Sequence, residues 1–231
     1  MTHKIITQIG SLPFTDVGMA VAYSLFHDIP FFPELPRLGD DFMNYINRPG
    51  KMSCLAEFKR HHFSTVKAQC IGPATLIMLG RSEDEAVEII HRHISAILDG
   101  LEAEETILFL DEPALGQAGF NFEDAWEAIF SSFPVVRGVH CCGNMDWDIL
   151  FRSATVDVIS FDASQFDISK YPLYRNGKII SWGIEKREDV SDFQEGDLIT
   201  LPCGMSPLKH VANDCLHELS KLFQIRDSLI G

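Results

Sequence analysis

Eight short apolar runs recur along this chain, and their regular spacing leaves few folds open to it. Several runs, such as the one at 106–110, are apolar throughout, which is typical of parallel strands buried on both faces. Each run is followed by a connecting segment, and several of these segments show apolar residues at helical spacing. The predicted strands cover residues 5–9, 29–32, 65–70, 106–110, 135–139, 157–161, 178–182 and 197–201.

The alternation of strand and connection predicts an α/β fold, a (β/α)8 TIM barrel, as a single domain over residues 1–231. Such barrels typically have about 250 residues, so a chain of 231 residues requires a shortened barrel with some helices short or missing. The clearest helix begins at a capping box formed by Ser82 and Glu85. Ser206 is expected to cap a last amphipathic helix.

The composition excludes two classes of partner. A net charge of -14 argues against nucleic acid, which requires a basic face. No apolar run approaches the roughly 20 residues of a membrane span. The first twenty residues lack a continuous apolar segment, and six cysteines are spread along the chain. We therefore expect a cytoplasmic protein with reduced thiols, in which Cys and His serve metal binding or catalysis.

Polar side chains collect directly after the predicted strands. In a barrel the carboxyl ends of all strands share one rim, and active sites lie at that rim. Residues far apart in the sequence are therefore expected to converge there. The candidates are Ser11, Glu34, Asp111, Glu112, His140, Cys142, Asp162, Glu185 and Cys203.

Three of these candidates form a predicted zinc site. His140 and Cys142 are two residues apart at the end of an extended run, so their side chains point to the same side. Cys203 follows the last predicted strand. A catalytic zinc ion typically has three protein ligands and an open fourth position. Asp162 is expected to be a weak, displaceable fourth ligand.

Each candidate also has a plainer structural interpretation. His140 and Cys142 are alternatively a core histidine and a buried thiol, and Asp111 and Glu112 simply end a strand. Glu34 and Glu185 are better interpreted as solvated loop acids. Ser11 is alternatively a turn hydroxyl, Asp162 a helix cap, and Cys54, Cys70, Cys141 and Cys215 are interpreted as structural thiols. Convergence on one rim is what favours a functional site.

Four segments resemble the superfamily that joins cobalamin-independent methionine synthase, corrinoid-dependent thiol methyltransferases and uroporphyrinogen decarboxylase. IGSLP at 9–13 is similar to the family's opening turn, and LDEPAL at 110–115 to the methionine-synthase signature. HCCGN at 140–144 resembles the zinc motif of the methyltransferases, and PCG at 202–204 the segment with the last zinc thiolate. QCIGPAT at 69–75 is a weaker match to a Gly-Pro-x-Thr turn.

The resemblance implies a zinc-dependent methyltransferase of methionine biosynthesis, which moves a methyl group from a corrinoid or folate donor to a zinc-bound thiol. It assigns zinc to His140, Cys142 and Cys203, with Asp162 where methionine synthase has a Glu. It also assigns the amino group of homocysteine to Asp111. Ser11 and Glu112 are expected to bind substrate as well.

The sequence alone does not identify the methyl donor or the acceptor thiol. Methionine synthase has a second, barrel-like half that is absent here, so a methylated corrinoid protein is the favoured donor and partner. The acceptor is a small-molecule thiol, either homocysteine or a thiol like coenzyme M. A sulfonate thiol requires cations, and Lys186, Arg187 and Lys209 are expected near the rim.

Two alternatives belong to other classes of protein. The first is a metal-free lyase of the decarboxylase type, although the Arg-rich N-terminal substrate motif of that branch is missing. The second is a non-catalytic, degenerate paralogue, because the short region between the second and third predicted strands removes room for substrate-binding parts. Metal content and sensitivity to chelation separate these alternatives from the methyltransferase.

Overall fold

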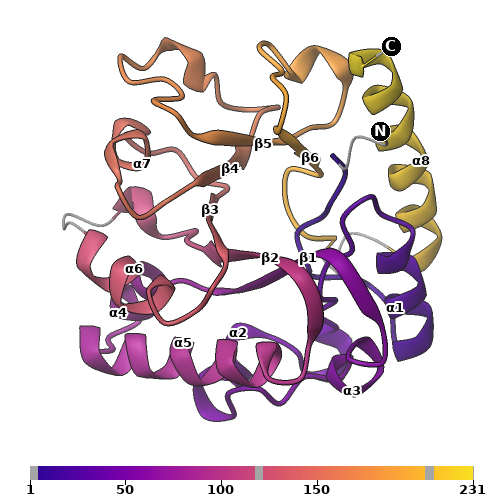
Figure 1. Cartoon of the computed structure of the whole chain (residues 1–231), viewed down its shortest axis with the longest axis vertical. Helices are drawn as coiled ribbons and strands as arrows, with labels where there is room; N and C mark the ends of the chain where they lie inside the picture. The colour runs from indigo at the N-terminus through magenta and orange to yellow at the C-terminus, as the bar shows by residue number, and fades with distance from the viewer. Residues whose placement is uncertain (1–4, 118–121, 206–210, 231) are drawn as a thin grey trace.

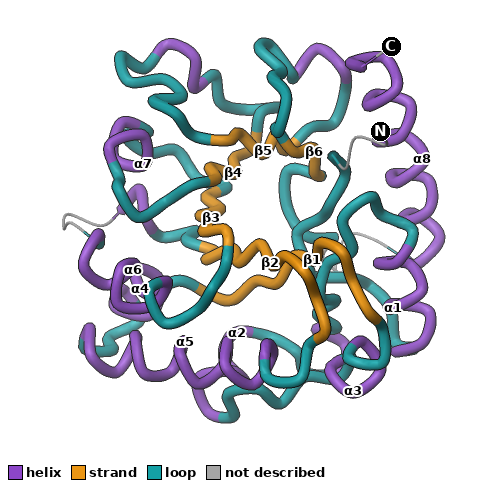
Figure 2. Tube along the Cα trace, viewed as in Figure 1, coloured by secondary structure: helices purple, strands orange, loops and turns teal. Residues whose placement is uncertain are grey.

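The computed structural model describes residues 5–117, 122–205 and 211–230, and its central element is one parallel sheet. Six strands lie side by side in the order in which they occur along the chain. Figure 2 shows them as an arc around the middle of the molecule, with β1 and β6 at its two ends. The strands are β1 (His62–Ile71), β2 (Glu102–Asp111), β3 (Val136–Cys141), β4 (Val158–Asp162), β5 (Ile179–Gly183) and β6 (Leu198–Thr200).

Helices lie outside this arc, so the sheet has an outer face covered by helices and an inner face (Figure 1). The α-helices are α1 (Val17–Leu25), α2 (Phe42–Asn47), α3 (Leu55–Phe58), α4 (Pro73–Met78), α5 (Glu83–Leu98), α6 (Glu123–Phe130), α7 (Asp148–Arg152) and α8 (Ala212–Ile230). The 3-10 helices are η1 (Pro36–Leu38), η2 (Leu115–Gln117), η3 (Ile168–Lys170) and η4 (Arg187–Asp189). Within the described ranges, no helix has the length and apolar character needed to cross a membrane.

The last six predicted strands are confirmed, and so is the best-marked helix. Ser82 Oγ accepts a hydrogen bond from the backbone N–H of Glu85 at 3.3 Å, while the Glu85 carboxylate accepts one from Ser82 N at 3.0 Å. This is the predicted capping box at the start of α5. Ser206 lies outside the described residues, and α8 is described from Ala212 onward.

The predicted closed eight-stranded TIM barrel is wrong. The described residues form a six-stranded half-barrel sheet, and the two N-terminal segments expected as strands are not part of it. Segment 5–9 makes a single bridge to β6 through Ile6 and Ile199, and segment 29–32 makes one to β1 through Phe31 and Lys67. The fold is therefore α/β with an all-parallel sheet, but without eight strands.

Side chains and prolines explain why these two segments do not become strands. The Asp28 carboxylate accepts the backbone N–H groups of Ile5 and Ile6, at 3.4 and 3.1 Å, in place of a strand neighbour. Pro30 has no N–H to donate, and Pro33 follows three residues later. Each of these two segments is therefore extended, but its hydrogen bonds to the neighbouring strand are too few to form a continuous β-ladder.

The inner face of the sheet holds a small apolar cluster, separate from the large core beneath the helices. Side chains alternate along each strand, so every second residue of β2 and β4 points inward. The members of the inner cluster are Ile9, Ile29, Ile107, Phe109, Val158 and Leu198. Asp111 comes two residues after Phe109 and points to the same side, which places a polar site directly beyond this cluster.

Candidate metal centre and adjoining pocket

His140 lies near the carboxyl end of β3, on the inner face of the sheet. It is buried, with 3% of its surface exposed. The strand register sets it beside Ser160 on β4, and its Nδ1 is 3.0 Å from Ser160 Oγ. When Nδ1 carries the proton, it donates to Ser160, and Nε2 then presents a lone pair. Nε2 is buried and has no hydrogen-bond partner.

A close approach of two loops brings Cys203 to this histidine. Cys203 follows β6, and its neighbour Gly204 lies against Ser11, where a Cβ on Gly204 would be only 2.8 Å from the Ser11 Cβ. The backbone N–H of Met205 also donates to the Ser11 carbonyl at 2.7 Å. Gly204 therefore lets the Cys203 loop pack onto the turn that contains Ser11.

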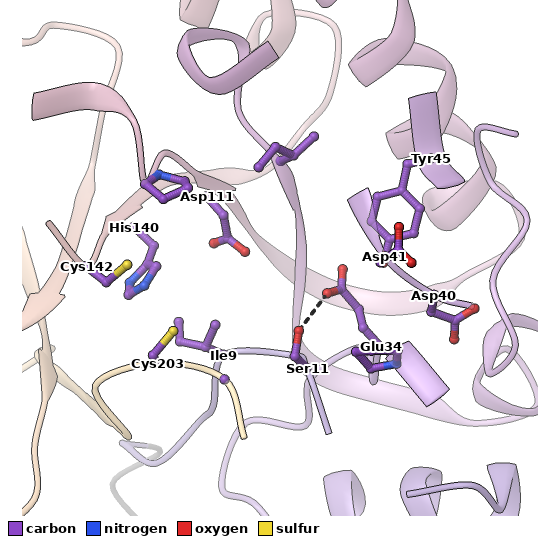
Figure 3. A pocket seen from close by; sticks show the side chains of 14 residues that line it. Ile9, Ser11, Glu34, Asp40, Asp41, Tyr45, Asp111, His140, Cys142 and Cys203 are labelled. Atoms are coloured by element: carbon purple, nitrogen blue, oxygen red, sulfur yellow. Dashed lines mark hydrogen bonds between the residues drawn. The ribbon is translucent and has the colours of Figure 1, made fainter. Parts of the chain in front are cut away.

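The ligand atoms of His140, Cys142 and Cys203 lie within 4.8 Å of one another. Figure 3 shows the three side chains gathered at one end of a pocket. A hydrogen bond between the two thiols lowers the pKa of Cys142. The same bond raises the pKa of Cys203 to about 12, an effect that His140 partly opposes. Cys142 is therefore the more acidic of the two thiols.

This donor set fits zinc. One imidazole nitrogen and two thiolates are common zinc ligands. Ligands in a tetrahedral zinc site lie roughly 3.5–4 Å apart, so a set already within 4.8 Å requires only a small closure. A metal would also satisfy the buried Nε2 of His140, and Ser160 would hold the ring in the required orientation.

Asp162, the expected fourth ligand, is not brought to the cluster. Its Oδ1 accepts hydrogen bonds from the backbone N–H and the hydroxyl of Ser164, at 3.0 and 2.6 Å. Its Oδ2 accepts one from Gln165 Nε2 at 2.8 Å. The carboxylate thus stabilises the turn after β4, because both oxygens are already used there.

A pocket of about 320 Å³ adjoins the cluster. Figure 3 shows the sulfur and imidazole groups at one end and several carboxylates toward the other. Pockets for small molecules start at about 300 Å³, so this one suits a compact ligand. Its lining residues are Ile9, Ser11, Glu34, Pro36, Asp40, Asp41, Tyr45, Ile71, Asp111, Pro113, His140, Cys142, Cys203 and Gly204.

Asp111 and Ser11, both predicted to bind substrate, line this pocket. Asp111 is half-buried, and its Oδ2 accepts a hydrogen bond from Gln69 Nε2 at 3.1 Å. Its Oδ1 has no hydrogen-bond partner. Burial raises the pKa of Asp111, whereas His140 and Lys67 act in the opposite direction. One carboxylate oxygen is therefore available to a ligand.

Glu112, also predicted to bind substrate, faces away from the pocket and is fully buried. Its Oε1 accepts from Ala74 N and Trp126 Nε1, and its Oε2 from the backbone N–H and hydroxyl of Thr75, all within 3.0–3.2 Å. Gly72 leaves the space that it occupies, since a Cβ there would lie 2.1 Å from the Glu112 Cδ. Burial raises the pKa of Glu112 to about 7, although these donors oppose the shift. Glu112 therefore ties β2 to the start of α4.

Glu34, a rim candidate whose plainer interpretation was a solvated acid, lines the pocket. Instead of a solvated loop acid, it is a buried side chain with 8% of its surface exposed. Its backbone pairs with Gly10 and Leu12, and Ser11 Oγ donates to its Oε2 at 3.5 Å. Burial raises the pKa of Glu34 to about 8, and repulsion from Asp111 adds to this shift. Its position two residues after the run 29–32 was the available signal.

The cations expected near the rim do not line this pocket. Lys186 and Arg187 are exposed and follow β5, with Arg187 at the start of η4, and the neighbouring Glu185 is exposed as well. Lys209 lies outside the described residues. The described lining of the pocket contains carboxylates but neither Lys nor Arg, so its electrostatic potential favours a cationic group.

No family model, no curated protein and no solved structure matches this chain. The resemblance to the methionine synthase superfamily therefore rests on the four short motifs.

Proposed function

We propose that this protein is a zinc-dependent methyltransferase that moves a methyl group to the sulfur of a small-molecule thiol. The observation that carries the proposal is the convergence of His140, Cys142 and Cys203 next to a pocket of small-molecule size. Three protein ligands with an open fourth position are the usual arrangement of a catalytic zinc site.

When bound, zinc lowers the pKa of a coordinating thiol and so makes thiolate available at neutral pH. His140 would bind through Nε2, with Ser160 holding the other ring nitrogen. The two cysteines bring negative charge to the site, which keeps electron density on the acceptor sulfur. The pocket walls orient the acceptor so that the methyl carbon is approached in line.

An amino acid thiol such as homocysteine fits this pocket better than a sulfonate thiol. Asp111 has an open carboxylate oxygen, Glu34 lies nearby, and the described lining contains neither Lys nor Arg. An ammonium group would be attracted to the Asp111 carboxylate, and a sulfonate thiol without an amino group lacks this interaction. We therefore favour an acceptor like homocysteine over one like coenzyme M.

The pocket volume also bears on the methyl donor. A space of about 320 Å³ is small, and an amino acid thiol would fill much of it. A methylcorrinoid protein presents its methyl group from a separate macromolecule and requires no deep donor pocket on this chain. We therefore favour such a protein over folate as the donor.

Metal content of the reduced protein tests the proposal, with wild type measured beside Cys142→Ser. We expect close to one zinc per wild-type chain and much less in the variant. Zinc-edge absorption should then show one added sulfur ligand when homocysteine is present. Zinc that is bound without any response to thiols would support the non-catalytic paralogue. Absence of zinc from protein with reduced thiols would reject the proposal, and turnover that survives chelation would favour the metal-free lyase.

A further inference from the structure

A buried amide joins the two acids of the pocket. The Nε2 of Gln69 donates to Asp111 Oδ2 at 3.1 Å and to Glu34 Oε2 at 3.5 Å. On its other side, Oε1 accepts from Gly10 N at 2.7 Å and from Lys67 Nζ at 2.6 Å. Both heteroatoms of the amide are therefore engaged, and Gln69 is itself only 2% exposed.

The surroundings determine which way the amide points. A backbone N–H and an ammonium group are donors only, so the atom facing Gly10 and Lys67 has to be the carbonyl oxygen. The NH2 group then faces Asp111 and Glu34. Gly10 also lies flat against the amide, since a Cβ there would be 2.9 Å from Gln69 Cδ. A flipped Gln69 would bring donors against donors and carbonyl oxygen against carboxylates.

Lys67 stabilises this orientation of the Gln69 amide by donating to its carbonyl oxygen. It is fully buried, and its Nζ donates to Gln8 O at 3.1 Å as well as to Gln69. The ammonium group also lies 4.7 Å from the centre of the Phe109 ring. Burial lowers the pKa of Lys67 to about 8, while Asp111 and Glu34 favour its charged form. Both of these hydrogen bonds go to uncharged oxygens, so the amide stands between this cation and the pocket acids.

We propose that Gln69, oriented by Lys67 and Gly10, is a positioning residue that sets Glu34 and Asp111 as a paired receptor for one ammonium group of the acceptor. The inference rests on the proposed function of the site. Each NH2 hydrogen occupies one oxygen of one acid, so the two carboxylates are held side by side. Asp111 Oδ1 keeps its lone pairs for the ligand. Both acids face the same pocket in Figure 3.

A pair of thiols tests this role. Homocysteine carries the ammonium group, and its des-amino analogue has the same chain, thiol and carboxylate without it. Affinities of both for the zinc-loaded full chain are measured by calorimetry, with the wild type beside Gln69→Met. Met has nearly the shape of Gln but neither donates nor accepts at the amide position. The matched control is Gln8→Met, because the Gln8 side chain is equally buried but bonds to Tyr23 and His27 instead.

Wild type is expected to bind homocysteine at least about tenfold more tightly than the analogue, since a charge-assisted hydrogen bond is lost with the amino group. Gln69→Met should lose most of this preference through weaker binding of homocysteine alone. Gln8→Met should keep it. A merely structural role of Gln69 would weaken both thiols equally.

Two further outcomes distinguish a failure of this inference from a failure of the proposed function. If zinc-loaded wild type binds neither thiol, the proposed function itself fails. If wild type prefers homocysteine and Gln69→Met retains the full preference, the function stands and the role of Gln69 is rejected. Gln69→Asn keeps the amide but shortens the side chain by one methylene. It takes the place of Gln69→Met if that variant does not fold, with the same expectation.

Discussion

Asp111 and Glu112 are adjacent in the chain, but they belong to two regions that use a buried carboxylate in opposite ways. Asp111 points to the inner side of the sheet, into the pocket, and one of its oxygens has no partner. Glu112 points into the layer between the sheet and helices α4 and α6, where both oxygens accept two hydrogen bonds. Strand geometry alone separates them, because successive side chains face opposite sides.

The difference shows how a buried polar group indicates its role. Burying a polar group is costly unless its hydrogen bonds are made, so a fully satisfied group such as Glu112 stabilises the fold. A group left with an open position, such as Asp111 Oδ1 or His140 Nε2, costs stability unless a ligand completes it. Variants on the pocket side should therefore change binding, and variants on the helix side should change stability.

The largest effect is expected at the metal ligands. His140→Ala and Cys203→Ser should each abolish stoichiometric zinc binding and reduce methyl transfer by about a thousandfold or more. Zinc content by mass spectrometry and single-turnover transfer to homocysteine measure this. Two controls should keep the metal, namely Cys141→Ala, a thiol outside the cluster, and Asp162→Asn, whose oxygens already bind Ser164 and Gln165. Full activity in either ligand variant would contradict the metal site.

The next effect is one of stability and lies on the helix side. Glu112→Gln turns an amide NH2 toward groups that are themselves donors, so the free energy of unfolding should fall by about 2–3 kcal/mol. Urea denaturation measures this change. Zinc stoichiometry should stay the same, because Glu112 does not line the pocket. In Glu85→Gln, the control, the acid belongs to an exposed capping box that tolerates Gln, so stability should change little. Loss of zinc with Glu112→Gln would break the distinction between the two regions.

On the pocket side, Asp111→Asn should weaken the binding of homocysteine by about tenfold. Its stability should be unchanged or slightly higher, because the variant removes a half-buried charge whose Oδ1 has no partner. Calorimetry with homocysteine and urea denaturation together give both values. Asp41→Asn is the matched control, since Asp41 lines the same pocket but caps α2, where Asn serves equally well. Equal weakening in both variants would show that the loss is not specific to Asp111.

The smallest expected effect is a pH dependence of stability from Glu34. Its pKa is about 8 in the folded protein against an ordinary value of 4.5. Between these values the unfolded state has released more protons, so the free energy of unfolding falls as the pH rises through this window. Glu34→Gln removes that contribution and should reduce the fall by at least about 1 kcal/mol. Urea denaturation at a series of pH values measures it, and parallel curves for both proteins would contradict the shift.

Several parts of the fold and site were predictable because they depend on local spacing. Six apolar runs became strands, since the interior of a parallel sheet is apolar on both sides. The two-residue spacing of His140 and Cys142 put them on one side, and the position of Cys203 after a strand put it at the same rim. Ser11 and Asp111 reached the pocket for the same reason.

Other parts depended on partners that are distant in the sequence. Asp28 and Pro30 turned two expected strands into bridged segments, which overturned the closed barrel. Asp162 accepts a hydrogen bond from Ser164 in the turn after β4, so its carboxylate stays away from the cysteines.

By itself, the sequence determined the positions of six strands, the convergence of the three candidate metal ligands and the clustering of polar groups at the strand ends, because alternation and apolar runs are properties of the local chain. Only the tertiary structure decided how many strands the sheet has, and which buried acids keep an oxygen free. Glu34, Gln69 and Lys67 gained their roles in this way. The reason is physical: the burial and hydrogen bonding of a side chain depend on all the elements that pack around it, and those elements come from the whole length of the chain.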